Sequence, residues 1–115
     1  MSFTQTIRVS AKDGEAIAEL MREWDDMQSR ADIMGYIGGA VLANRDEPDS
    51  YLIIADFGEV EPGVSSVEEA ELNNQREQTQ QWAVRLREVI EGEPVYHNYD
   101  ELYWTGFTDA SGARL

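Results

Sequence analysis

The stretches "MGYIGGAVLA" (34–43) and "YLIIADF" (51–57) decide the fold, because both are rich in residues that favour β-strands. Between them lies "NRDEPDS" (44–50), a turn-forming segment that contains Pro48 and suits a hairpin. The sequence therefore predicts two neighbouring strands joined by a short loop. The glycines of the first strand indicate a bulge or a close approach of another backbone.

A strand and a helix precede this hairpin. The segment "FTQTIRVS" (3–10) alternates apolar and polar residues with the period of two expected of a half-buried strand. Asp13 is a suitable N-cap, and apolar residues then recur at helical spacing on one face as far as about Ser29. The region before the hairpin is thus predicted to be strand followed by helix.

A helix and a strand follow the hairpin. The helix is expected over residues 66–90, because Ser and Glu at capping-box spacing begin it and Gly92 and Pro94 end it. The aromatic segment "PVYHNYDELYW" (94–104) then predicts a last strand.

The predicted order is β-α-β-β-α-β, which is that of the ferredoxin-like α+β sandwich with a four-stranded antiparallel sheet. We expect one domain over residues 1–105 and a C-terminal tail, poorly ordered, over residues 106–115. The chain has 115 residues, and one domain is the usual organisation at this length.

One face of this sheet needs a partner. Two helices cover only one face of a four-stranded sheet, yet the strand 51–57 is apolar on both, with Leu52 and Ile54 on one and Ile53 and Phe57 on the other. A second copy of the same sheet would cover the bare face. The sequence therefore predicts a homodimer with an isologous interface.

Composition excludes several classes of function. The formal net charge is −14, which repels nucleic acids and anionic membranes, and neither is expected as a partner. The chain has no cysteine, its first residues lack a signal-peptide pattern, and no segment has the roughly 20 apolar residues of a membrane span. A cytoplasmic protein is expected. Gly35, Gly38 and Gly39 have the wrong spacing for a dinucleotide-binding loop.

The second helix has an unusual polar half. The first nine residues of "NNQREQTQQWAVRLREVI" (73–90) hold nothing hydrophobic, and the apolar stripe is complete only from Trp82 onward. On a helical wheel, Gln75 and Thr79 point the way Trp82 points. These polar turns either extend past the domain or cover a cavity, in which Gln75, Thr79 and Gln78 would hydrogen-bond a ligand. Trp82 itself is either a core residue or a stacking wall for an aromatic ligand.

The chain resembles the antibiotic-biosynthesis-monooxygenase-like family over about residues 3–104. The resemblance rests on the element order, on "GYIGGAVL" followed by the hairpin into "YLIIADF", on "EEAELNNQREQTQQWAVRL" (68–86) and on "GEPVYHNYDEL" (92–102). It implies a dimeric α+β barrel in which two ferredoxin-like sheets pack face to face. It also implies a pocket between helices and sheet, where members of the family oxidise quinols or polyphenols without metal or flavin. The haem-degrading relatives use an asparagine, a tryptophan and a helical histidine, whereas this chain has no histidine in its second helix and has Gln5 in place of any asparagine in its first strand.

Four residues outside the polar turns are candidates for a site. His97 is the only histidine, and it is the default general base because its ordinary pKa suits proton transfer near neutrality; alternatively it is satisfied by hydrogen bonds at the dimer interface or near the surface. Asn74 lies where the helix resembles the family and is a second catalytic candidate, with exposure to solvent as the alternative. Tyr36 could line the pocket, and Asp56 is either a pocket carboxylate or a strand-end carboxylate in water. No spacing of ligands indicates a metal site.

Three classes of function remain open. The first is a cofactor-independent monooxygenase acting on a small aromatic compound such as a quinol, with no cofactor bound. The second is a small-ligand binder without turnover, and the third is a structural dimer whose polar helix half overhangs the partner. A cavity bounded by Thr79, Trp82 and the sheet favours the first two, whereas a helix with no cavity beneath it favours the third.

Overall fold

The predicted hairpin is present in the computed structural model, which describes residues 3–31, 36–58 and 65–110. Strand β2 (Tyr36–Ala43) pairs antiparallel with β3 (Ser50–Phe57), and the register shifts between Tyr36 and Gly38. This shift confirms the bulge predicted from the glycines. The Asn44 side chain accepts hydrogen bonds from the backbone N–H groups of Asp46 and Glu47 and shapes the loop between the strands.

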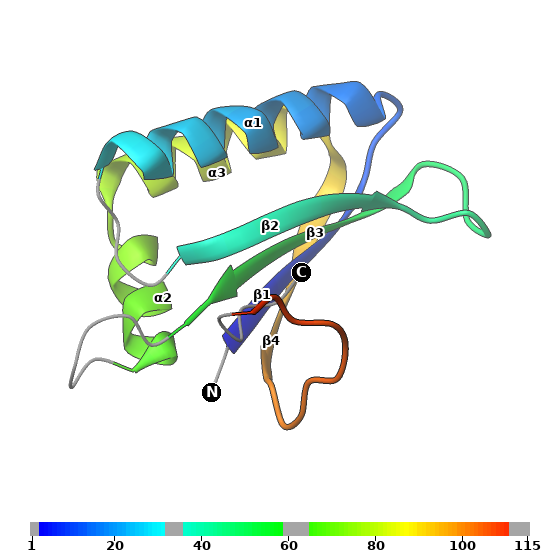
Figure 1. Cartoon of the computed structure of the whole chain (residues 1–115). Helices are drawn as coiled ribbons and strands as arrows, with labels where there is room; N and C mark the ends of the chain where they lie inside the picture. Colours follow the sequence, from blue (N-terminus) through cyan, green and yellow to red (C-terminus); the bar gives the residue numbers. More distant parts are fainter. Residues whose placement is uncertain (1–2, 32–35, 59–64, 111–115) are drawn as a thin grey trace.

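The hairpin forms one half of a four-stranded antiparallel sheet with the order β2-β3-β1-β4. Strand β1 (Phe3–Ser10) lies between β3 and the edge strand β4 (Glu91–Asp100), and α1 (Gly14–Ala31) connects β1 to the hairpin. All helices lie on one side of the sheet (Figure 1). The predicted ferredoxin-like α+β fold is thereby confirmed for the single chain. Within the described residues, no helix is long and apolar enough to cross a membrane.

The helix predicted over residues 66–90 is divided into two. Helix α2 (Ser66–Asn74) ends at a turn in which the Gln75 N–H contacts the carbonyl oxygens of Glu71 and Leu72, each at 3.3 Å. Helix α3 (Glu77–Val89) begins after Arg76, whose backbone is extended. Each helix packs against a different part of the core. Ala70 of α2 packs with Phe3 and Phe57, whereas Leu86 of α3 packs in the main cluster under α1. The polar residues between them supply no apolar stripe to keep one helix continuous.

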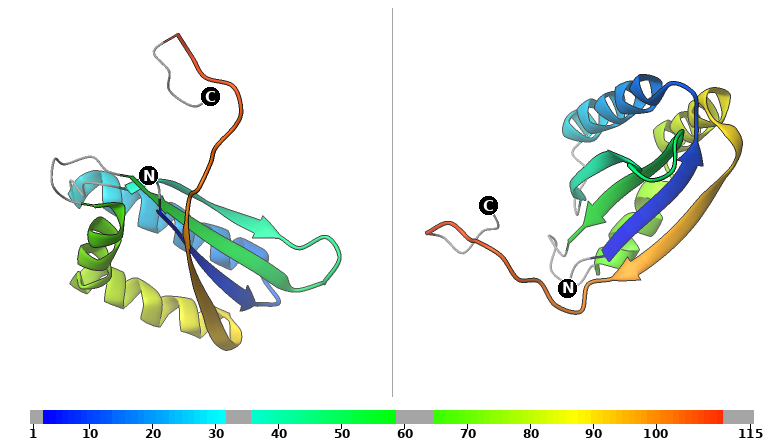
Figure 2. Two further views of the ribbon diagram at one scale, coloured as in Figure 1. Left: turned by 90° about the horizontal axis from the view of Figure 1, so that it is seen from below. Right: turned by 90° about the vertical axis from the view of Figure 1, so that its right-hand side faces the viewer.

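The last strand begins three residues before its predicted start and ends four residues earlier than predicted. Gly92 and Pro94, which we expected to end the helix, lie inside β4, with Gly92 at φ +74°. An edge strand tolerates both residues, because proline need not donate a hydrogen bond on its open side. After β4 the chain runs away from the sheet and the helices (Figure 2). Its apolar side chains Leu102, Tyr103 and Phe107 are 83–90% exposed.

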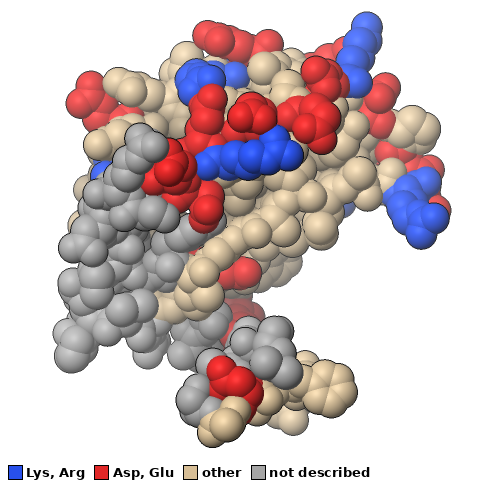
Figure 3. All heavy atoms as spheres, turned by 45° about the horizontal axis from the view of Figure 1, so that its top comes forward, with Lys and Arg blue, Asp and Glu red and all other residues tan. Residues whose placement is uncertain are grey.

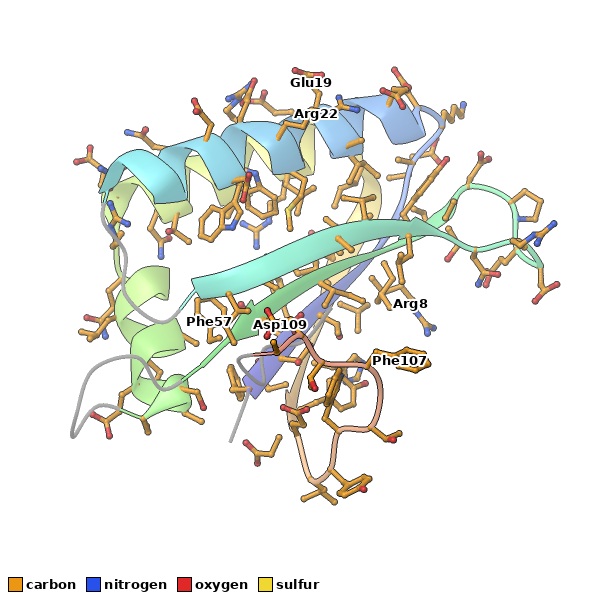
Figure 4. All side chains as sticks on the ribbon, viewed as in Figure 1. Arg8, Glu19, Arg22, Phe57, Phe107 and Asp109 are labelled. Carbon is orange, nitrogen blue, oxygen red and sulfur yellow. The ribbon has the colours of Figure 1, made fainter. Side chains whose placement is uncertain are left out.

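Strand alternation gives the sheet two different faces. On the face under the helices, Ile7, Val9 and Ile53 join Ile17 and Leu20 of α1 and Leu86 of α3 in the main core, while the side chains between them point to the opposite face. Figure 4 shows Arg8 on that opposite side of the sheet, and Glu19 and Arg22 on the outer side of α1. The helix-covered face therefore holds the core, and within residues 3–31, 36–58 and 65–110 no helix covers the other face.

Candidate functional site

A cavity of about 400 Å³ lies between the helix-covered face of the sheet and the helices α1 and α3. This volume is within the range of small-molecule sites. Strands β1, β3 and β4 form its floor, and the two helices form its roof and sides. The polar turns of the second helical segment thus cover a cavity, at least in the part that belongs to α3.

The inner walls of the cavity are apolar. Trp24, Ile53 and Phe57 contribute to the lining and are at most 5% exposed, so they pack firmly behind it. The remaining apolar lining comes from Ile7, Met21, Ala55, Trp82, Ala83 and Val84, and Tyr96 adds an aromatic ring from β4. Such walls suit a flat apolar ligand, because they exclude water and offer aromatic faces.

Trp82 connects the two helices above the cavity. Its indole Nε1–H donates a hydrogen bond of 2.9 Å to the backbone carbonyl oxygen of Leu20 in α1. Its ring lies 5.7 Å from the ring of Trp24 at an interplanar angle of 54°. This tilted arrangement is a favourable geometry for an aromatic pair. Trp82 is therefore both a packing residue and part of the cavity wall.

A charged pair joins the same two helices on the outside. The Arg85 guanidinium of α3 donates from Nη1 and Nη2 to the two carboxylate oxygens of Glu23 in α1, a two-pronged pair that fixes orientation. The pKa of Arg85 is raised, chiefly by this hydrogen bond and by the charge of Glu23. Both side chains are largely solvent-exposed, so the pair orients the helices more than it stabilises them.

The polar lining consists of Gln5, Thr79, Gln80 and Arg87, together with the Tyr96 hydroxyl. Gln5 comes from β1, and the other three come from α3. Amide and hydroxyl groups of this kind can orient the polar substituents of a ligand by hydrogen bonding. In residues 3–31, 36–58 and 65–110, no three His, Asp or Glu side chains gather as metal ligands do.

The fold agrees with several solved structures. A candidate antibiotic biosynthesis monooxygenase from Nitrosomonas europaea superposes with a TM-score of 0.69 and 17% identity, over 91% of this chain and 94% of that chain. SnoaB, a cofactor-independent oxygenase from Streptomyces nogalater, superposes with a TM-score of 0.70 and 13% identity, over 90% and 95% of the two chains. A third such protein, from Bordetella bronchiseptica, gives a TM-score of 0.67 at 14% identity, over 89% and 98%.

The chain has the fold of the antibiotic biosynthesis monooxygenases. No protein-family model and no curated protein matches its sequence. At these identities the likeness establishes the fold, as the resemblance read from the sequence predicted, and it leaves the substrate open.

Two of the predicted site residues reach the cavity of this monooxygenase fold. Thr79 and Trp82 both line it, as the helical wheel predicted. Gln75 and Gln78 do not contribute to the lining within the described residues, and both side chains are exposed. Gln75 does not reach the cavity because the helix breaks before α3, so that this residue is not part of the helix whose face turns toward the sheet. The ligand-binding roles of all four residues stay predictions.

His97 lies on the opposite face of the sheet from the cavity. It pairs with Thr6 in the β1–β4 ladder, whereas its neighbour Tyr96 pairs with Ile7 and lines the cavity. The His97 side chain is exposed, and its ring lies 6.2 Å from that of Tyr99 on the same face. This placement does not fit the expectation that His97 is the general base for a ligand in the cavity. It agrees with the alternative of a histidine near the surface or at a dimer interface.

The remaining candidates give less information. Asn74 is the last residue of α2, and Tyr36 pairs with Phe57 through its backbone, but both side chains lie outside the described part of the chain. Asp56 accepts a hydrogen bond of 2.6 Å from the Thr4 hydroxyl. Because Asp56 and Thr4 are paired on the bare face, Asp56 is no part of the cavity.

Sequence reasoning missed several residues of the lining. Gln5 carried a signal, because it is the one polar residue on the apolar side of its alternating strand, between Phe3 and Ile7. Tyr96 carried none, since the last strand has aromatic residues on both faces. Arg87 could have been found only by knowing which side of α3 meets the cavity.

Proposed function

We propose that the protein is a cofactor-independent monooxygenase-like enzyme that acts on a small aromatic compound, a quinol or polyphenol, in the cavity between the sheet and the helices α1 and α3. The observation that carries the proposal is the aromatic lining of this cavity, with Trp24, Trp82, Phe57 and Tyr96 around a volume of about 400 Å³. The shared fold with a cofactor-independent oxygenase supports the reaction type.

The proposed reaction uses the substrate as its own source of electrons. A phenol loses its hydroxyl proton, and the electron-rich ring reduces dioxygen. One oxygen atom becomes a quinone carbonyl at the ring carbon that carried hydrogen, and the other leaves as water. The protein would hold the ionised ring between the apolar walls of the cavity. There, hydrogen bonds from Gln5 and Thr79 can favour the phenolate over the phenol. The site roles of Asn74, Tyr36, Gln75 and Gln78 are retained as proposals around the same cavity.

Turnover of a dihydroxynaphthalene under air and under nitrogen tests the proposal. We expect quinone to form only with oxygen, and the rate to fall when Thr79 is replaced by Val, which removes the hydroxyl and keeps the side-chain shape. The exposed Gln81→Ala on the same helix is the matched control for general effects of substitution on α3, because Gln81 does not line the cavity. Binding without quinone formation in any of several dihydroxynaphthalenes would favour a ligand-binding protein, and the absence of binding would favour the structural dimer.

We also propose that the chain forms a homodimer through the bare face of the sheet. Leu42, Val95 and Tyr99 are about half exposed there, and Leu52 and Ile54 lie between them in the strand register. An apolar face of this extent, left open on a monomer, is typical of an interaction site. A second copy is the simplest partner, because the bare faces of two copies can cover each other when they are related by a two-fold axis.

The distribution of charge supports this interface. By strand register, the charged residues on the bare face of the described sheet include Arg8, Asp56 and, at the start of β4, Glu91; Asp56 is held by Thr4. Figure 3, seen from the helical side, shows acidic and basic side chains gathered over α1. In a chain of net charge −14, a face with only a few charges of both signs allows two copies to approach with limited repulsion. The cytoplasmic location and the domain boundary at residue 105 stay predictions from the sequence.

A further inference from the structure

Charge is unevenly distributed around the cavity. The chain has 23 Asp and Glu residues against 9 Lys and Arg, yet the described lining contains no carboxylate and one charged side chain, that of Arg87. The chain is strongly acidic, yet the described lining of the cavity carries one positive charge and no negative charge. A cavity that accepted cations or was indifferent to charge would not need this arrangement.

Arg87 differs from three basic residues that form ion pairs on the surface. Arg22 pairs with Glu15 and Glu19, Arg85 pairs with Glu23, and Lys12 pairs with Glu91. Arg87 makes no hydrogen bond or ion pair within the part of the chain that the structure describes. Its five N–H donors are therefore available to a ligand.

The position of Arg87 makes the two ends of the cavity chemically different. It lies in the last turn of α3 and its side chain is exposed, so it belongs to the open end. Trp24, Ile53 and Phe57, at most 5% exposed, close the other side with apolar walls. A ligand that satisfies both ends has a flat apolar body and an anionic group at one end.

We infer that Arg87 makes the cavity selective for aromatic acids, that is, aromatic ligands with a carboxylate or a comparable permanent anion directed at the open end. This inference rests on the proposed binding of small aromatics in the same cavity, and it narrows their class. The planar guanidinium matches a carboxylate with two parallel hydrogen bonds, which a neutral isostere such as an amide cannot reproduce.

Two effects oppose anion binding, and both are weaker than a direct contact between the anion and the Arg87 guanidinium. The net charge of −14 repels anions, but at physiological ionic strength the Debye length is about 8 Å, so distant carboxylates are largely screened. The carbonyl end of α3, where Arg87 lies, also carries partial negative charge, but this is only about half an elementary charge against the full positive charge of the guanidinium. A direct contact with the guanidinium acts over about 3 Å and is screened least, so we expect it to dominate.

The test compares 2-naphthoate with 2-naphthamide, which have nearly the same shape and differ in charge at neutral pH. Calorimetric titration of the full chain gives both dissociation constants, for the natural protein and for Arg87→Gln, Arg87→Lys and Arg45→Gln. Arg45 is exposed in the loop between β2 and β3, so Arg45→Gln removes the same charge away from the cavity. Circular dichroism melting checks that each variant is folded.

We expect the naphthoate to bind about three- to tenfold more tightly than the amide. Arg87→Gln should remove this preference by weakening the acid alone, Arg87→Lys should keep part of it, and Arg45→Gln should leave it unchanged. Equal affinities for the two compounds, or a preference that survives Arg87→Gln, would overturn the inference while leaving aromatic binding in place. If neither compound binds, the proposed function fails, and the inference fails with it.

Discussion

Replacing Trp82 by Phe is expected to lower the free energy of unfolding by about 1–2 kcal/mol. The substitution removes the hydrogen bond of 2.9 Å from the indole to the Leu20 carbonyl oxygen, a contact worth about 0.5–1.5 kcal/mol. It also removes part of the ring that packs against Trp24 and the main core, and because Trp82 is only half-buried this adds roughly 0.5 kcal/mol. In a domain of this size, the sum corresponds to a fall in Tm of about 4–8 °C.

Urea unfolding followed by circular dichroism measures this difference, and an unchanged dependence of the free energy on urea would show that the folded state keeps its compactness. Gln78→Ala is the control, because Gln78 is exposed on the same helix and should change stability by less than about 0.5 kcal/mol. A loss for Trp82→Phe no larger than that of the control would show that Trp82 does not hold α3 to α1, and the cavity roof would need another support.

Three further predictions concern assembly and chemistry. The protein should sediment as a dimer at micromolar concentration and Leu42→Asp as a folded monomer, because a buried charge at the bare face has no partner; a monomeric natural protein would contradict the interface. Turnover of a dihydroxynaphthalene should be the same with and without a metal chelator, and its loss on chelation would give a metal ion a role. His97→Ala should retain turnover within about twofold, since His97 faces away from the cavity; a fall of about 10²-fold or more would return the role of base to this histidine.

The order of the elements could be predicted because it depends on local patterns. Alternation in residues 3–10 and helical spacing after Asp13 identify β1 and α1, and two runs of β-forming residues identify the hairpin. The break at Arg76 was not predictable in the same way. Asn73 and Asn74 are weak helix formers but good ones follow them, so the sequence signal is slight, and the separate packing of Ala70 and Leu86 into two clusters shows why α2 and α3 part.

For the candidate site, too, the residues placed by a local pattern could be predicted, and those placed by strand pairing could not. Thr79 and Trp82 were found because one helical face carries both toward the sheet, a purely local relation. The face on which His97 lies could not be predicted, because sequence alternation shows that His97 and Tyr96 lie on opposite faces without showing which face meets the helices. The partner strand decides this, since Ile7 belongs to the core and Tyr96 stands beside it in the register.

Alternation also ties the cavity to the proposed interface. Tyr96 lines the cavity while its neighbours Val95 and His97 face the bare side, so one strand serves both faces. A slip of β4 by one residue against β1 would exchange them, placing the histidine in the cavity and the tyrosine outside. If a second sheet covers the bare face, burial of Tyr99 opposes that slip, because the slip would put Asn98 or Asp100 in its place in the interface. The proposed dimer would then fix the register that keeps Tyr96 in the cavity, although its interface touches no lining residue.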